Sequence, residues 1–360
     1  MHRRSFLTGL ATASAAALAS RPLLAASSIA TPKIKVGLDN FAVRAMQWKA
    51  PALIDYAASL KCDTLFISDL MAFESLEDAA LRDIRRKAEA AGLELYLGSW
   101  SICPTSKTFK KDWGTAEEHL RLTIRVAKAL GSPVARVVLG NMEDRKTEGG
   151  IQARIADTVK VLKACKGDAE RAGIKIAIEN HGGDLHSWET RQLIEQAGTD
   201  FVGANIDSGN AVWTLEDPMD VLETLGPITI CSSLRDAMVW DAPEGATIQW
   251  TAAGEGLTDW KKWTARWLQL CPKVPIMIET ISGGPRTFAY KKPEFWQYYD
   301  KRPEKLAKFE ALAARGKPIP AFKNPTDPKE RTAAQQAYQK SEIEKSIAYL
   351  RNEIGLGVRA

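Results

Sequence analysis

The chain has 360 residues, of which 45% are hydrophobic and 26% are charged, and its formal net charge is +5. This composition excludes a disordered chain, because the apolar fraction is high and the net charge is low. Only the first thirty residues leave room for a membrane span. The chain contains eleven Trp and only four His. So few histidines argue against an enzyme with several zinc ions, since imidazole is a principal zinc ligand.

Residues 1–30 have the parts of a twin-arginine export signal. Arg3 and Arg4 are followed by an apolar run rich in Ala and Leu and then by small residues. The run is short for a membrane span, and an Arg-Pro pair interrupts it. We therefore expect export by the twin-arginine machinery, cleavage after Ala26 or Ala30, and a periplasmic or secreted protein with no stable membrane span.

The predicted leader holds three arginines and no acid, which leaves the mature chain at about +2. This near-neutral charge gives no reason to expect a nucleic-acid partner. The five cysteines lie far apart and lack the spacing of a metal site. We expect them to be small, buried apolar residues, with one disulfide as the remaining alternative.

Short apolar runs from residue 34 onward predict eight strands, at 34–38, 64–67, 93–97, 136–139, 174–178, 201–206, 228–234 and 275–278. Amphipathic stretches between them predict helices over 76–91, 116–130 and 151–172. Eight strands that alternate with helices over about 250 residues predict a (β/α)8 TIM barrel. A doubly wound sheet is the alternative, but no glycine-rich phosphate loop follows the first strand.

The chain changes character after the eighth predicted strand. We assign residues 31–300 to the barrel and residues 301–360 to a C-terminal helical extension packed on it. Within the extension, 314–329 is rich in Pro, Lys and Asp and predicts an extended arm, whereas 331–354 has a helical rhythm. The extension could shape the site or a subunit contact, so an oligomer is compatible with the sequence.

Three carboxylates, Glu179, Asp207 and Glu279, directly follow three of the last four predicted strands. Active sites of such barrels gather at the C-terminal ends of the strands. A carboxylate there is costly unless it is paired or binds a cation, and three of them suit Mn²⁺ or Mg²⁺. Such an ion would acidify the C–H next to a sugar carbonyl, and Glu179 or Glu279 would move the proton. For each acid taken singly, the alternative is a salt-bridged loop residue.

Five segments carry a resemblance, and they follow one another in order: Ile-Ala-Ile-Glu-Asn-His at 176–181, Asn-Ile-Asp-Ser-Gly-Asn at 205–210, Ser-Leu-Arg-Asp at 233–236, Gly-Glu-Gly-Leu-Thr-Asp at 254–259 and Ile-Glu at 278–279. Over roughly residues 34–300 the chain resembles the xylose-isomerase-like TIM barrels of the sugar phosphate isomerase/epimerase group. The resemblance implies that Glu179, Asp207 and Glu279 hold a metal together with a histidine on the seventh strand. It also implies that the two Glu handle the substrate proton.

The chain departs from this group on the seventh strand, where the group has His-x-Lys-Asp and this chain has Ser233-Leu234-Arg235-Asp236. Ser233 is a poor replacement for the imidazole ligand, and Asn210 stands where many relatives have a second His. His181 or His186 could supply a nitrogen ligand. Either a weaker site built from oxygen ligands, with Ser233 among them, remains, or the metal has been lost and the scaffold does different work.

Other polar and aromatic residues at the strand ends are candidates for sugar contacts. An indole can stack on a sugar ring, amides can bind hydroxyl groups, and Arg235 can take the place of the group's lysine and orient an oxyanion. The substrate-binding candidates are Trp100, Asn141, Asn180, His181, Asn210, Trp213, Arg235 and Asp236, with Trp240 and Arg286 as further candidates. Trp260, Trp263 and Trp267 have helical spacing and are expected in the core.

Three functions remain open at this point. The first is an exported isomerase or epimerase that moves a proton next to the carbonyl of a sugar or sugar derivative. The second is a lyase or hydrolase that cleaves a keto-glycoside by the same acidification of a C–H bond, and the third is a sugar-binding barrel without activity. An apurinic-site endonuclease is set aside, because that chemistry needs a histidine-rich site with several zinc ions.

Overall fold

The computed structural model describes residues 33–359, so the predicted leader lies outside the described residues. Within them, eight parallel strands form one sheet in the order β10-β1-β2-β3-β4-β5-β6-β7. The bounds of these strands are β1 Val36–Asp39, β2 Thr64–Ile67, β3 Glu94–Ser101, β4 Val134–Val138, β5 Lys175–Glu179, β6 Val202–Ile206, β7 Thr229–Ser232 and β10 Ile276–Ile278.

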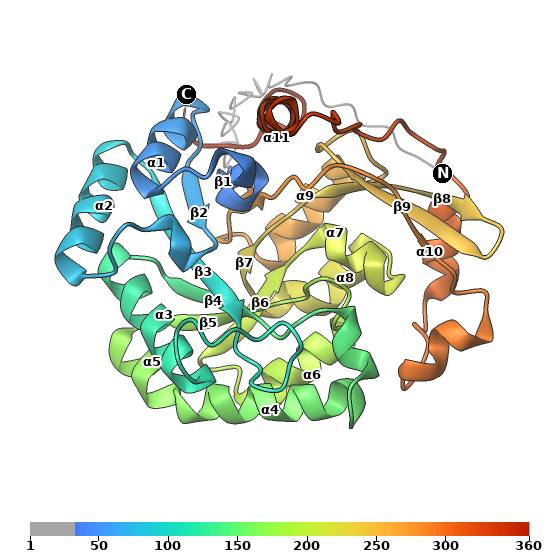
Figure 1. Cartoon of the computed structure of the whole chain (residues 1–360), viewed down its shortest axis with the longest axis horizontal. Helices are drawn as coiled ribbons and strands as arrows, with labels where there is room; N and C mark the ends of the chain where they lie inside the picture. Colours follow the sequence, from blue (N-terminus) through green and yellow to red (C-terminus); the bar gives the residue numbers. More distant parts are fainter. Residues whose placement is uncertain (1–32, 360) are drawn as a thin grey trace, which may run out of the picture. The chain divides into compact units, whose positions relative to one another are not determined.

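The two edges of this sheet meet through Leu234, just after β7. The Leu234 N–H donates to the carbonyl of Met277 at 2.7 Å, and the Leu234 carbonyl accepts from Glu279 N at 2.9 Å. The sheet is thus a nearly closed barrel wrapped by helices, as Figure 1 shows, and the predicted (β/α)8 class is confirmed. All eight predicted apolar runs overlap these strands, because parallel strands covered on both faces need nearly continuous apolar sequence.

Helices follow most of the strands, and their bounds are α1 Ala50–Ser59, α2 Asp78–Ala90, α3 Ala116–Leu130, α4 Gly150–Ala164, α5 Lys166–Ala172, α6 Ser187–Ala197, α7 Ser208–Ala211, α8 Pro218–Leu225 and α9 Trp260–Leu270. Short 3-10 helices join them, namely η1 Asn40–Met46, η2 Leu70–Ala72, η3 Met142–Lys146, η4 Val212–Thr214 and η5 Gly226–Ile228. Helix α3 has the predicted ends, since Thr115 and Glu118 form a capping box before Gly131 ends it. The helix predicted over 151–172 is instead two helices, because the backbone leaves helical geometry at Cys165 (φ −103°, ψ 2°).

A second, antiparallel sheet lies outside the barrel. Strands β8 Asp236–Ala242 and β9 Gly245–Thr251 form a hairpin, and β11 Arg286–Phe288 pairs with β9. Together with η6 Pro293–Tyr298 and α10 Leu306–Ala313, they bury a separate apolar core. These elements, here named the accessory region, lie at one side of the barrel in Figure 1. The sequence patterns did not predict this sheet, and it begins within the segment assigned to the barrel.

Helix α11 (Pro328–Asn352) packs against η1 and β1. Gln339 Oε1 accepts from Ala45 N at 2.8 Å, and Gln336 donates to the Ala45 carbonyl at 3.0 Å. The helical rhythm predicted from residue 331 is confirmed, and residues 314–327 before it form neither helix nor strand. Among the described residues, no helix combines the length and the apolar content that a membrane span requires.

The buried cysteines and tryptophans agree with the sequence expectation. All five cysteines are buried and unpaired in the part of the chain that the structure describes. Trp260, Trp263 and Trp267 are buried on α9.

Candidate functional site

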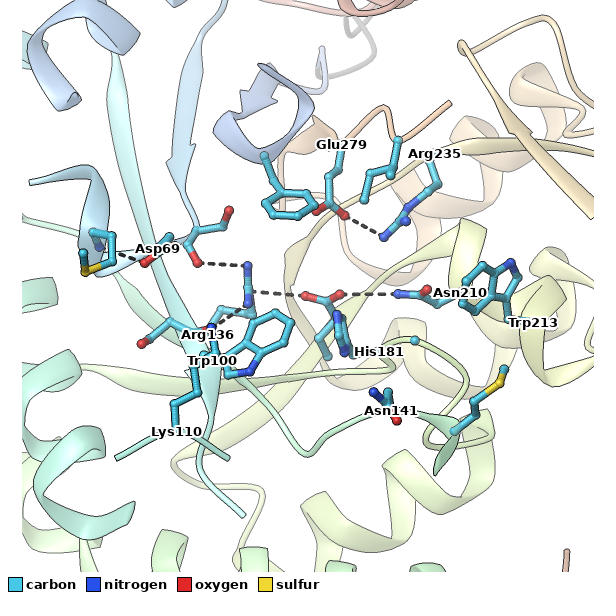
Figure 2. Close-up of a pocket in the computed structure, with 18 of the residues that line it drawn as sticks. Asp69, Trp100, Lys110, Arg136, Asn141, His181, Asn210, Trp213, Arg235 and Glu279 are labelled. Atoms are coloured by element: carbon cyan, nitrogen blue, oxygen red, sulfur yellow. Dashed lines mark hydrogen bonds and ion pairs between the residues drawn. The ribbon is translucent and has the colours of Figure 1, made fainter. Parts of the chain in front are cut away.

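One cavity of about 500 Å³ opens at the C-terminal ends of the barrel strands. Eight of the predicted site residues line it: Trp100, Asn141, Glu179, His181, Asn210, Trp213, Arg235 and Glu279. Figure 2 labels all of these residues except Glu179, together with Arg136. Their gathering follows from the topology, because parallel strands deliver the residues that follow them to one end of the barrel.

Three carboxyl groups converge at the floor of this cavity, as the sequence predicts. Oxygen atoms of Glu179, Asp207 and Glu279 lie within 4.8 Å of one another, and all three side chains are buried. Asp207 itself is fully buried. Its Oδ1 caps the short helix α7 by accepting hydrogen bonds from Gly209 N and Asn210 N. The cavity is therefore reached by Glu179 and Glu279 rather than by Asp207.

Arg235 lies between two of these carboxylates. Its Nη2 donates to Asp207 Oδ2 and, at 2.6 Å, to Glu279 Oε2, a contact drawn in Figure 2. The guanidinium also stacks on the Trp250 ring, with Cζ 4.2 Å from the ring centroid. A Cβ at position 209 would clash with the Arg235 side chain, so Gly209 makes room for it. Four neighbours thus hold the guanidinium in one place.

Arg136 is a functional candidate that the sequence analysis missed. Its Nε lies 3.2 Å from Glu179 Oε2, and its Nη1 donates to the Ser99 carbonyl at 2.7 Å. A Cβ at Gly98 would lie only 2.9 Å from Arg136 Nε, so a glycine there leaves space for the guanidinium. A charged residue in the middle of the apolar strand β4 was the available signal, since such a residue is buried at a cost unless it is paired.

Burial shifts the acids of this site toward their neutral forms. Desolvation raises the pKa of Asp207 to about 6 and raises the pKa of Glu279 well above its ordinary value, although Arg235 opposes both shifts. Burial also raises the pKa of Glu179, against the pull of Arg136. Carboxyl groups with raised pKa values exchange protons closer to neutral pH, which is what a general acid or base requires.

Glu279 also has a free oxygen. Its Oε2 binds Arg235, whereas its Oε1 has no hydrogen-bond partner among residues 33–359 and is not enclosed. Glu179 is more completely engaged, because Oε1 accepts from Asn210 Nδ2 at 3.4 Å and Oε2 faces Arg136. Glu279 Oε1 is therefore the carboxylate oxygen best placed to take or give a proton in the cavity.

His181 lines the cavity as a neutral imidazole. Burial lowers its pKa to about 4, against the opposing hydrogen bond to Gly140. Its Nδ1 lies 2.6 Å from the Gly140 carbonyl oxygen, which only accepts, so Nδ1 carries the proton and Nε2 keeps its lone pair. The ring meets Trp100 edge to face at 5.2 Å between centroids. His181 can therefore accept a hydrogen bond from a substrate hydroxyl group.

Part of the cavity wall, next to Arg235, is aromatic. Trp213 stacks on Trp250 at 4.3 Å between centroids, and Arg286 Cζ lies 4.7 Å from the centroid of the Trp213 ring. Both Trp213 and Arg286 line the cavity, as does Trp250, which the sequence analysis did not single out. Trp250 was missed because it lies on a strand of the accessory region, which the sequence patterns did not reveal.

Other predicted residues are engaged in holding the backbone of loops and short helices. Asn180 bonds the backbone N–H and carbonyl of Asp207 and so joins β5 to β6, without lining the cavity. Asn141 Oδ1 caps η3 from the cavity wall. Asp236 accepts from five donors, three of them backbone N–H groups of the loop that follows the hairpin. Neither Asp236 nor Trp240 lines the cavity. These positions give Asn180 and Asp236 a role in holding loops rather than a contact with a ligand.

A family model described as Xylose isomerase-like TIM barrel matches residues 54–294. The chain belongs to this family. The 3-oxo-isoapionate decarboxylase of Pectobacterium atrosepticum is 21% identical over 185 residues. This match covers 51% of the chain and 60% of the decarboxylase, so the chain spans less than two thirds of the length of this curated relative.

Two solved structures show the same fold. A D-psicose 3-epimerase crystallised in the presence of D-fructose is 15% identical, with 88% of this chain and 98% of that chain covered and a TM-score of 0.57. The IOLI protein with a binding zinc atom is also 15% identical, with 78% and 96% covered and a TM-score of 0.55. At these identities the likeness concerns the fold, and function has to be argued from the site.

The acidic triad expected for a metal is present, but its surroundings do not fit a divalent cation. Asp207 and Glu279 already share the guanidinium of Arg235, and Glu179 faces Arg136. A metal ion bound by these carboxylates would have to displace Arg235 and leave a buried guanidinium without its carboxylate partners, which costs several kcal/mol. Ser233, at the place of the family's histidine, donates to Asp39 Oδ2 at 3.2 Å. The donor set is therefore engaged within the protein.

Proposed function

We propose that this protein is an exported enzyme that moves a proton at the carbon next to the carbonyl of a sugar or sugar derivative, as a sugar isomerase or epimerase does. One observation carries the proposal: Glu179 and Glu279 reach the same cavity, each beside a buried guanidinium, and Glu279 has a free oxygen. Two carboxyl groups with raised pKa values can remove a proton from one position and return it at another.

The arginines supply the complementary charge. Removal of a proton next to a carbonyl places negative charge on the carbonyl oxygen, and fixed donors aimed at that oxygen lower the barrier. Arg235 lines the cavity beside Glu279, and Arg136 lines it beside Glu179. A guanidinium thus lies beside each of the two carboxyl groups. In the proposed reaction, this is the part of the cavity where negative charge develops on the substrate.

Two further features support a sugar as the substrate. His181 Nε2 and the amide of Asn141 offer hydrogen-bond partners for hydroxyl groups, while Trp100 provides an apolar edge. The names of the relatives agree with this chemistry, because epimerisation next to a carbonyl and decarboxylation of a 3-oxo acid both place charge on a carbonyl oxygen. The divalent metal expected from the sequence is not part of this proposal, since Arg235 lies among its expected ligands.

The test is hydrogen exchange with solvent. Wild-type protein is incubated with D-fructose, D-psicose and D-tagatose in D₂O, and the signal of the proton next to the carbonyl is followed by NMR. We expect loss of that signal with wild type and a much slower loss with Glu279→Gln, with the exposed Asp241→Asn variant as the matched control. Wild-type protein that introduces no deuterium into any ketose would count against the proposal.

A second candidate is cleavage of an oxidised glycoside, and the size of the cavity favours it. The cavity extends from the triad to Lys110 and Trp113 on one side and to Arg286 on the other, which gives room for a ring and its substituent. A 3-keto sugar would lose the C2 proton to a glutamate, and a C1=C2 double bond would form as the C1–O bond breaks. The aglycone oxygen would leave with the electrons of that bond and take up a proton. A nitrophenyl 3-keto-glucoside separates the two reactions, because free nitrophenol appears only if the bond is cleaved.

Export remains a proposal based on the leader in residues 1–30. The test replaces both Arg3 and Arg4 by Lys in the full chain and compares cell fractions. We expect the wild type in the periplasm or medium and the variant in the cytoplasm. An unchanged distribution would show that these arginines do not direct the protein.

A further inference from the structure

The positive charge at the floor of the cavity is carried by two side chains. Arg235 pairs with Asp207 and Glu279, and Arg136 pairs with Glu179. Two guanidinium groups carry the same total charge as one divalent cation, and they reach the same three carboxylates. An arginine stays charged at any pH at which the protein is folded, so this charge is permanent.

Arg235 is built into this position. Its side chain lies over the face of Trp250 and against Gly209, where any side chain would clash with it. Its backbone is fixed as well, because Ser208 Oγ donates to the Arg235 carbonyl at 2.6 Å and accepts from Arg235 N at 3.1 Å. The residue is 3% exposed. These contacts come from α7, which follows β6, and from β9 of the accessory region, so two elements far apart in the sequence hold one guanidinium in place.

One end of the guanidinium remains available. Nη2 is shared by the two carboxylates, whereas Nη1 has no hydrogen-bond partner among residues 33–359 and is not enclosed. Arg235 lines the cavity, so Nη1 is the donor that a substrate oxygen can reach. The same side chain can therefore neutralise the carboxylates with one nitrogen and bind an oxyanion with the other.

We propose that Arg235 replaces the divalent cation of this site, so that this chain is a metal-independent member of its family with a guanidinium as its fixed cation. The role toward a substrate oxyanion rests on the proposed function. The exclusion of a metal ion rests on the contacts of Arg235 alone and holds whatever the substrate is.

The test is isothermal titration calorimetry, in which MnCl₂ is titrated into full-length protein that has been dialysed against EDTA. We expect no saturable binding to wild type up to about 1 mM Mn²⁺. A single Mn²⁺ bound per chain with a micromolar dissociation constant, and lost in Glu179→Gln, would overturn the proposal. Circular dichroism of each variant confirms that it is folded before titration.

Two variants make the titration specific. Ser233→His alone adds an imidazole but leaves Arg235 among the carboxylates, so we expect no gain in Mn²⁺ binding. The double variant Ser233→His with Arg235→Met removes the competing cation as well, and we expect its Mn²⁺ affinity to exceed that of wild type by 100-fold or more. Equal gains in both variants would show that Arg235 does not occupy the metal position.

An activity assay addresses the oxyanion role separately. Deuterium exchange by Arg235→Ala should fall, and added methylguanidinium should restore part of it, because the small cation can enter the space of the lost side chain. Rescue by Mn²⁺ instead would contradict a guanidinium requirement. If wild type exchanges no sugar proton at all, the proposed function has failed, while the calorimetry still decides the question of the metal.

Discussion

The barrel and the accessory region meet at Arg235, and they hold it by different forces. From the barrel, Asp207 and Glu279 attract the guanidinium through charge. From the accessory region, Trp250 supplies a flat aromatic face and no charge. The carboxylates of the proposed chemistry thus follow barrel strands, whereas the accessory region helps to fix where the Arg235 side chain points. Mutations of the barrel carboxylates should therefore affect the proposed chemistry itself, whereas mutations in the accessory region should affect stability or the position of Arg235.

The largest effect is expected where the barrel supplies the chemistry. Glu279→Gln keeps the size of the side chain but removes the carboxyl group that moves the proton in the proposed function. We expect kcat for deuterium exchange to fall by about 10²- to 10⁴-fold, the usual contribution of a general acid or base. The thermal midpoint should change little. Unaltered exchange in this variant would show that Glu279 does not transfer the proton.

The next effect concerns stability at the junction of the two regions. Asp236 begins β8, and its carboxylate accepts from five donors, among them Gly254 N at 3.0 Å and Trp260 Nε1 at 2.9 Å. Asp236→Ala leaves these donors unpaired, and each donor that stays buried without a partner lowers the free energy of unfolding by about 1–3 kcal/mol. Urea denaturation should therefore show a free energy of unfolding that is lower by at least about 3 kcal/mol. Asp241→Ala, on the exposed part of the same strand, is the control and should cost little.

A third prediction concerns acid stability at another contact between the regions. Burial opposes ionisation of Glu189, but hydrogen bonds and charge from His186 and Arg145 lower its pKa to about 2. Tyr299, next to η6, covers the Arg145 guanidinium at 4.4 Å. A pKa below that of the unfolded chain means that the unfolded state binds a proton first as the pH falls. Protonation of Glu189 should therefore lower the free energy of unfolding of the protein by about 3 kcal/mol between pH 5 and pH 2.

Glu189→Gln tests this assignment, because glutamine does not titrate. Urea denaturation of wild type and variant at several pH values should show a smaller acid-induced loss in the variant. Parallel curves for the two proteins over this pH range would contradict the assignment to Glu189.

The smallest effect is expected for the aromatic support of Arg235. Trp250→Ala removes a cation–π contact worth about 0.5–2 kcal/mol, which corresponds to a loss of about 2- to 30-fold in kcat/KM. Trp240→Ala changes the same hairpin outside the cavity and serves as the control. If both variants lose activity equally, the hairpin acts through its stability and not through the orientation of Arg235.

The two regions also differ in how well the sequence predicts them. The eight barrel strands were predictable because each is a short apolar run, and Glu179, Asp207 and Glu279 stood out as acids directly after such runs. The accessory hairpin was not predictable, because β8 starts immediately after Arg235 and no turn residues separate the two. Nor could a linear pattern show that Trp250 packs on Arg235, because Arg235 lies between β7 and β8 whereas Trp250 lies on β9.

The sequence likewise predicted one part of the site and not another. The loss of the histidine at Ser233 was visible in the sequence and raised the question of the metal. The sequence could not show that Arg235 reaches both Asp207 and Glu279, or that Arg136 faces Glu179, because side-chain direction depends on the packing of neighbours such as Gly209. The sequence therefore predicted many of the residues that gather, and the structure adds Arg136 and Trp250 and shows which side chains pair.

Proton exchange by wild-type protein can be measured in D₂O with excess EDTA and, in parallel, with added Mn²⁺. If Arg235 is the fixed cation, we expect the protein to introduce deuterium next to the carbonyl of a ketose at the same rate in both samples. Exchange that stops in EDTA and returns with Mn²⁺ would contradict the assignment of Arg235 as the fixed cation. Absence of exchange in both samples would contradict the proposed proton transfer itself.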